Sequence, residues 1–409
     1  MLNKIWASFF LIAFVSALLQ LLMNGDTQVF VRLMESVFSM SRLAFEISLG
    51  LVGVMAFWLG MMKIGEQSGF LRVCTAFLKP LLQKLFPSLP SGHPVMGSML
   101  MNLSSNALGL DNAATPLGLK AMKDLQTLNP EPETATDAQI LFLVLNTSSV
   151  TLFPVTVFAF RAQQGAANPT DVFIPILFAT FMSTLTGLVL VAIRQKLDLC
   201  NRVVLAYLGG LFFLMTALLL YFMGLEREAM QAQSAFLSNF LLFSVIAGFI
   251  AGALIRKVNV FETFVSGAKE GFEVAVTIIP YLVAMLVGIG VLRACGVLDG
   301  FLEIVRWGLS LMGADVRFVD ALPTALMKPF SGSGARSLMV EAMQVHGADS
   351  FAGRLACIVQ GSTETTFYVV ALYFGAVKIK NTRNAIPLGL AADLAGILTA
   401  IGMGYLFFG

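Results

Sequence analysis

Charge is scarce in this sequence. Only 12% of the 409 residues are Asp, Glu, Lys or Arg, whereas 57% are hydrophobic and the mean hydropathy is +0.83. Soluble domains carry about a quarter charged residues, so a soluble fold of this length would leave too much apolar surface in water. The formal net charge is +2, and no basic stripe is long enough to follow nucleic-acid phosphates. The composition therefore predicts an integral membrane protein without a nucleic-acid partner.

Cysteine and histidine are few as well. The four cysteines, Cys74, Cys200, Cys295 and Cys357, are far apart and form no C-x-x-C motif, and two histidines cannot complete a zinc site with them. The Gly-rich stretch "GSGAR" is not followed by a phosphate-loop lysine, and no Ser–His–Asp set can be assembled. We therefore expect no enzyme activity, no metal site and no cofactor, apart from a coupling H⁺ or Na⁺.

Long apolar runs are abundant. A membrane-spanning helix needs about twenty mainly apolar residues. Clean candidates lie at 5–23, 47–62, 171–193, 203–223, 235–255, 273–292 and 386–408, and the first is interpreted as a retained helix rather than a signal peptide. Two further spans, 138–160 and 356–377, are long enough but polar at their centres. The pattern predicts an all-α polytopic membrane protein with about nine transmembrane helices.

Four shorter segments fit other roles. The stretches 92–122 and 322–343 are apolar at their edges and broken at their centres by Gly, Pro, Ser and Asn, which predicts two re-entrant helical hairpins. The segments 68–86 and 297–311 have apolar residues every three or four positions, which is typical of helices that lie flat at the membrane interface.

The distribution of Lys and Arg predicts the orientation. Short loops rich in these residues stay in the cytoplasm. Such loops follow the spans 171–193, 235–255 and 356–377, and a basic flat helix occupies 68–86. We therefore expect the cell inner membrane, a cytoplasmic N-terminus and an external C-terminus.

The two polar spans resemble each other. "SSVTLFPVTVFAF" (148–160) aligns without gaps with "STETTFYVVALYF" (362–374), and the same order of elements precedes each. Because the two spans are predicted to cross in opposite directions, the pattern indicates two inverted-topology repeats, at about 45–160 and 273–377. We divide the chain into a half at 1–200, a connecting helix and external loop at 201–234, and a half at 235–409.

Polar, helix-breaking segments recur at equivalent points of both repeats. Irregular backbone at membrane depth survives only where protein buries it or where it lines a wet cavity. Free helix N-termini at the hairpin tips would also suit anions or carboxylates. The candidate substrate-binding residues are Asn102, Ser104, Ser105, Asn106, Asn112, Thr115, Asn146, Thr147, Ser148, Ser149, Ser331, Ser333, Gln360, Ser362, Thr363, Glu364 and Thr365. The alternative is that these small polar residues only permit close helix packing.

Glu364 is the candidate site for the coupling ion. An ionisable side chain between apolar turns is costly in a membrane and is usually functional. It could take up a proton, coordinate sodium or bind a substrate amine, and the alternative is a structural ion pair with Lys328 or Arg336. Asp393, about two turns into the last span, is expected to pair with a backbone donor.

Several long motifs resemble known families. "NLSSNALGLDNAATPLGLKAM" and "NTSSVTLFPVTVFAFRA" resemble the spore maturation protein A family, whereas "PFSGSGARSLMVEAM" and "GRLACIVQGSTETTFYVVALYFGAV" resemble the spore maturation protein B family. Nearly the whole chain is similar to a fusion of the two. The resemblance implies an inner-membrane transport protein with one Gate, or nucleoside-recognition, unit in each half. It also implies that A and B act as a heterodimer where they are separate chains.

Together these features favour a secondary transporter for a small polar organic solute such as a nucleoside, an amino acid or a related metabolite. Its expected partners are that small molecule and the lipid bilayer, and homo-oligomerisation is left open. The alternative is a channel-like or scaffold membrane protein without uphill transport of its own.

Overall fold

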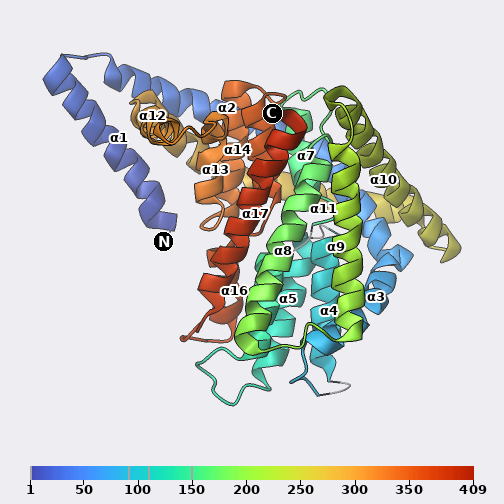
Figure 1. Ribbon diagram of the computed structural model, residues 1–409. Coiled ribbons are helices and arrows are strands. Elements are labelled where there is room, and N and C mark those ends of the chain that lie inside the picture. Colours follow the sequence, from blue (N-terminus) through green and yellow to red (C-terminus); the bar gives the residue numbers. More distant parts are fainter. Residues whose placement is uncertain (1, 91–92, 109–110, 149–150) are drawn as a thin grey trace.

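The computed structural model describes residues 2–90, 93–108, 111–148 and 151–409, and these fold almost entirely into helices (Figure 1). In chain order they are α1 (Leu2–Asn24), α2 (Val29–Ser68), α3 (Phe70–Leu85), α4 (Pro94–Ala107), α5 (Asp111–Gln126), α6 (Asp137–Thr147), α7 (Val155–Gln163), α8 (Phe173–Gln195), α9 (Arg202–Met223), α10 (Arg227–Ile255), α11 (Val260–Ala294), α12 (Val297–Leu311), the 3-10 helix η1 (Arg317–Ala321), α13 (Leu322–Met327), α14 (Gly332–His346), α15 (Phe351–Gly361), α16 (Thr366–Ala376) and α17 (Ala385–Phe408).

The prediction of an all-α polytopic membrane protein is confirmed. Within the described residues, eight helical segments are long and apolar enough to cross a membrane. Large apolar side chains such as Leu22, Phe213 and Ile255 are exposed on them, as expected of surfaces that face lipid. The ninth predicted span is the pair α6 and α7, each too short to cross alone.

Two of the predicted spans are much too short. The spans predicted at 47–62 and 273–292 belong to α2, with 40 residues, and α11, with 35 residues. In α2 the charged Arg32, Arg42 and Glu46 are exposed, while Leu33 and Ala44 are buried on the other face. The predicted span begins only after these charges, because a hydropathy criterion excludes the segment that carries them. That segment is nevertheless helical and amphipathic. A helix of 40 residues is about 60 Å long, so α2 is about twice as long as a hydrocarbon layer of about 30 Å is thick.

A left-handed glycine joins each long helix to an amphipathic one. Gly69 (φ 82°) lies between α2 and α3, and Gly296 (φ 75°) lies between α11 and α12. This backbone conformation carries a steric penalty for residues with a Cβ atom, so glycine suits both corners. The predicted amphipathic segments at 68–86 and 297–311 are therefore joined to the preceding long helix by the same kind of glycine corner in both halves.

The long helices α2 and α11 pack antiparallel in a way that relates the two halves. Counting back from the corner glycines, Lys63 corresponds to Gly290 and Met40 corresponds to Gly267. A Cβ atom on Gly267 would lie 2.6 Å from Lys63 Cβ, and one on Gly290 would lie 2.6 Å from Met40 Cγ. Replacing both residues of the first contact by their counterparts gives the second contact, which is the signature of an interface with two-fold symmetry.

The same relation holds between α8 and α17, the helices that follow the two polar spans. A Cβ atom on Gly187 would lie 3.2 Å from Ala392 Cβ, and one on Gly396 would lie 3.0 Å from Ser183 Cβ. Ser183 precedes Gly187 by four residues, as Ala392 precedes Gly396. The Ser183 hydroxyl donates to the Ala392 carbonyl at 2.9 Å, so the glycines permit close backbone approach.

The two halves also exchange contacts at both ends of the molecule. The Ala135 amide donates to the Asn381 carbonyl at 3.0 Å. At the other end, the Ala167 amide donates to the Asp349 carboxylate at 2.8 Å. When the gapless alignment of 148–160 with 362–374 is extended in both directions, Ala135 corresponds to Asp349 and Ala167 corresponds to Asn381. These loops therefore form a third pair of equivalent contacts.

The halves run in opposite directions. In Figure 1 the hairpin of α4 and α5 occupies the lower part of the molecule, whereas α13 and α14 occupy the upper part. The first polar span ends at the top with α7, and the second ends at the bottom with α16 (Figure 1). This arrangement has the inverted topology that the sequence predicts.

The packing of α2 on α11 predicts how a single methyl group affects stability. A Cβ atom on Gly271 would lie 2.6 Å from Ala56 Cα and 2.7 Å from the Met55 carbonyl oxygen, whereas Gly53 of α2 has nothing within 4 Å. Gly271→Ala should lower the melting temperature in detergent, because separating two backbones costs about 1–3 kcal/mol. Gly53→Ala is the matched control and should leave the melting temperature unchanged or slightly raised. Equal melting temperatures for the two variants would contradict the packing.

Candidate functional site

The interruptions in the two polar spans meet each other. The first lies between α6, which ends at Thr147, and α7; the second lies between α15 and α16 and contains Thr363 and Glu364. The Glu364 amide donates to the Thr147 carbonyl at 2.8 Å, and the Thr363 hydroxyl contacts the same oxygen at 3.1 Å. The two halves thus join through the backbone at the point where their helices break.

Each hairpin also bonds to the break of its own half. The Leu152 amide donates to the Ala107 carbonyl at 2.8 Å, and the Phe367 amide donates to the Pro329 carbonyl at 3.0 Å. Ala107 is the last residue of α4, and Pro329 lies between α13 and α14. One backbone amide beside each break is therefore paired with a hairpin carbonyl rather than left in the hydrocarbon.

A polar network around Asn146 connects the first break to α16 of the other half. Asn106 Nδ2 donates to Asn146 Oδ1 at 2.7 Å, and the Tyr373 hydroxyl donates to the same oxygen at 3.2 Å. Asn102 Nδ2 donates to the Ala114 carbonyl at 2.8 Å and approaches the Tyr373 hydroxyl at 3.4 Å. Three of the predicted polar residues thus take part in one network.

A cavity of about 90 Å³ opens beside the breaks. Of the predicted site residues, Gln360, Thr363 and Glu364 line it. The full lining is Thr151, Phe153, Pro154, Val155, Thr156, Val157, Lys328, Gly332, Arg336, Gln360, Gly361, Thr363 and Glu364. It therefore draws on both breaks and on the second hairpin, and it holds side chains of both charge signs.

The structure places the other predicted residues in three ways. Buried ones are Asn102, Ser104, Ser105, Asn146, Thr147, Ser148, Ser331, Ser362 and Thr365, and partly buried ones are Asn106, Thr115 and Ser333. Ser149 and the side chain of Asn112 lie outside the described residues. The hydroxyls of Ser148 and Ser362 donate back to Val144 and Val359 of their own helices, at 2.7 and 2.8 Å. For these two serines, the structure shows bonding within the helix.

Asp393 of α17 differs from its prediction. In place of a backbone donor, its carboxylate accepts hydrogen bonds from the hydroxyls of Thr363 and Thr366, the second at 2.7 Å. The side chain is 1% exposed and lies directly behind the second break. The sequence feature that points to this residue is its position inside an otherwise apolar span, because ionisable residues within membrane segments usually have a function.

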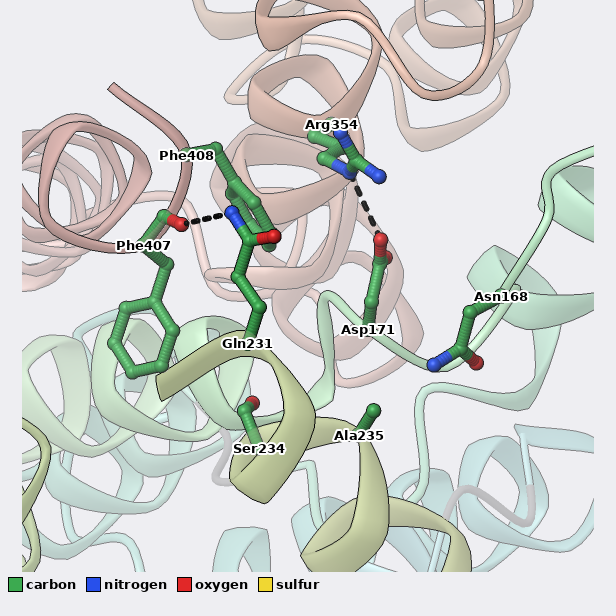
Figure 2. A pocket seen from close by; sticks show the side chains of 8 residues that line it. All are labelled: Asn168, Asp171, Gln231, Ser234, Ala235, Arg354, Phe407 and Phe408. Carbon is green, nitrogen blue, oxygen red and sulfur yellow. Dashed lines mark hydrogen bonds and ion pairs between the residues drawn. The ribbon is translucent and has the colours of Figure 1, made fainter. Parts of the chain in front are cut away.

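A second cavity, of about 150 Å³, lies where the loop before α8 meets α10, α15 and the end of α17 (Figure 2). Figure 2 shows Arg354 paired with Asp171, at 2.8 Å, and Gln231 donating to the Phe407 carbonyl. The fully buried Arg161 completes the cluster, 2.8 Å from Asp171 and 3.1 Å from Asp349. Because these charges neutralise one another, we interpret the cluster as a structural ion-pair network that joins the two halves.

The fold and the site define a class of protein. Two halves of opposite orientation bring interrupted helices together at a cavity with charged walls, a layout found in secondary transporters. The model of the Gate family, described as nucleoside recognition, matches residues 48–164 and 275–380, which together exceed half of the chain. The chain belongs to the Gate family.

Curated relatives agree with the resemblance seen in the sequence. The chain is 43% identical over 190 residues to spore maturation protein A of Bacillus subtilis (strain 168), a match that covers 46% of this chain and 93% of that protein. It is 45% identical over 165 residues to spore maturation protein B of the same organism, covering 40% of this chain and 91% of that protein. No solved structure matches significantly.

The network around Asn146 predicts a loss of stability. Asn146→Leu keeps the approximate volume but leaves Asn106 Nδ2 and the Tyr373 hydroxyl without their acceptor, and each buried unsatisfied group costs about 1–3 kcal/mol. The melting temperature should fall. Tyr373→Phe removes one donor and leaves the bond between Asn106 and Asn146, so its effect should be smaller. A melting temperature for Asn146→Leu at or above that of Tyr373→Phe would show that the network does not stabilise the first break.

Proposed function

We propose that this protein is a secondary transporter for a small polar organic solute, rather than an enzyme. The observation that carries the proposal is the hydrogen-bonded meeting of the two helix breaks, through Thr147 and Glu364, beside a charged cavity. Packing alone does not require a broken helix, and a break in the hydrocarbon is tolerated where it is buried in protein or lines a cavity. In transporters with inverted repeats, the two halves exchange conformations, so that the cavity opens first to one side of the membrane and then to the other.

The cavity favours an amino-acid-sized zwitterion among the solutes that the sequence suggests. Its wall carries charge of both signs, positive from Lys328 and Arg336 and negative from Glu364, which suits a solute that itself carries both charges. Pockets that enclose larger ligands usually measure about 300–1,000 Å³. At about 90 Å³, this cavity would have to widen considerably for a nucleoside.

We further propose that the protein resides in the cytoplasmic (inner) membrane with its C-terminus external. The loops at 196–201 and 377–384, which contain four Lys or Arg residues, lie at the same lower end in Figure 1. The C-terminus lies at the opposite, upper end (Figure 1). Because basic loops remain in the cytoplasm, this distribution supports a cytoplasmic lower end. Helix α1 begins at mid-height and rises to the upper end (Figure 1), so we also propose a cytoplasmic N-terminus.

Solute exchange in proteoliposomes tests the proposal. Vesicles containing the purified protein are preloaded with a mixture of unlabelled amino acids and nucleosides, and entry of each labelled compound is measured. We expect saturable exchange of at least one amino acid. Glu364→Gln should raise its KM by about 10- to 100-fold, because a charge-assisted hydrogen bond contributes about 1.5–3 kcal/mol.

Glu228→Gln, at the start of α10 and away from the cavity, is the control and should exchange like the unaltered protein. Non-saturable entry would favour the channel-like alternative. Absence of entry for every compound, from protein that melts normally, would contradict the proposed function.

A further inference from the structure

The buried carboxylate of Asp393 occupies a position with an informative counterpart. Because Gly187 corresponds to Gly396, Thr184 of α8 corresponds to Asp393 of α17; each precedes its glycine by three residues. The Thr184 hydroxyl donates to the Ser148 carbonyl at the first break. The first half therefore places a neutral donor where the second half places a carboxyl group, which can donate only while it holds a proton.

The hydrogen bonds around Thr363 require more protons than the hydroxyls provide. Its Oγ1 lies within hydrogen-bonding distance of Asp393 Oδ1, of the Glu364 carbonyl at 2.9 Å and of the Thr147 carbonyl at 3.1 Å. A hydroxyl has one proton to donate. The hydroxyl proton of Thr366 is directed to Asp393 Oδ2 at 2.7 Å. With an ionised Asp393, the Thr363 proton goes to the carboxylate and the Glu364 carbonyl loses this donor.

One additional proton, on Asp393, resolves the shortage. Asp393 Oδ1 then donates to Thr363 Oγ1, and Thr363 donates its own proton to the Glu364 or the Thr147 carbonyl. The proton also removes a charge that would be costly in the membrane interior. Lys328 and Glu364 are the charged groups whose fields reach Asp393. The neighbouring helices face this region with hydroxyl groups, Ser183 from α8 and Thr366 from α16.

We propose that Asp393 is a proton-binding site and carries the coupling proton of the transporter, a role that the sequence had suggested for Glu364. The coupling part rests on the proposed function. Asp393 releases its proton by way of Thr363 Oγ1, which lines the cavity: the hydroxyl takes the proton of Asp393 and gives its own proton to water there. The carboxylate that results draws the Thr363 hydroxyl away from the two carbonyls. The hydroxyl then no longer ties the second break to Thr147 of the first. Because Thr363 also lines the cavity, solute and proton act on the same side chain.

Infrared difference spectroscopy of the full chain in lipid vesicles tests the proton site without any solute. The wild type should show the carbonyl stretch of a protonated carboxyl group at neutral pH, and the band should disappear reversibly as the pH rises. Asp393→Asn should abolish this band, and Glu364→Gln should retain it. Should Asp393→Asn fail to fold, Asp393→Thr, which copies Thr184, provides the same readout. A band unaffected by either Asp393 variant, or a response to Na⁺ in place of pH, would overturn the proposal.

Transport measurements separate the failure of this proposal from that of the proposed function. A pH gradient should drive at least tenfold accumulation of an exchanged amino acid, and Asp393→Asn should abolish accumulation while preserving exchange. If Asp393→Asn still exchanges the amino acid and also accumulates it as the wild type does, the coupling role is overturned but the proposed transport function is not. Absence of exchange in the wild type would refute transport and coupling together, whereas the infrared result still decides whether Asp393 binds a proton.

Discussion

The inability of hydrocarbon to form hydrogen bonds is the constraint on which this structure depends. Every interrupted helix must find protein partners for the backbone groups it releases. Here Thr147 of one half accepts from Glu364 of the other, and each hairpin supplies a carbonyl to its own break. The bond between the two breaks therefore forms only when the halves are assembled. The antiparallel packing of α2 on α11 and of α8 on α17 is what holds the halves in that register.

Within this symmetric frame, the differences between the halves carry the chemistry. Thr184 and Asp393 occupy equivalent positions, yet one is neutral and the other is ionisable. The ends of the molecule differ too. The pair of Lys380 and Glu133 is 74% and 66% exposed, whereas Arg161 is fully buried in its cluster. Exposed ion pairs contribute little, but breaking a buried one costs about 3–5 kcal/mol. The ion pairs between the halves at the two ends therefore differ in strength.

Much of this fold could be predicted from the sequence because the membrane imposes simple rules. Apolar runs of sufficient length predicted the spans, and polar interruptions predicted the hairpins and breaks. The same rules failed where charge and helix coincide, so the exposed charges of α2 concealed most of its length. The direction of side chains could not be predicted either. Nothing in the sequence indicates that Ser148 bonds its own helix whereas Thr363 faces the cavity. Asp393 was undervalued because its hydroxyl partners, Thr363 and Thr366, lie 30 and 27 residues earlier in the chain.

Accessibility from the two sides of the membrane tests most directly whether the breaks line an alternately opened cavity. After replacement of the four native cysteines, single cysteines are introduced at Thr151 of the first break and Gln360 beside the second, with Ala159, buried in α7, as the control. An impermeant thiol reagent is applied to each side of oriented vesicles. We expect both cavity positions to react from either side and Ala159→Cys from neither. Reaction from one side alone under every condition, or no reaction at all, would contradict a transport cavity.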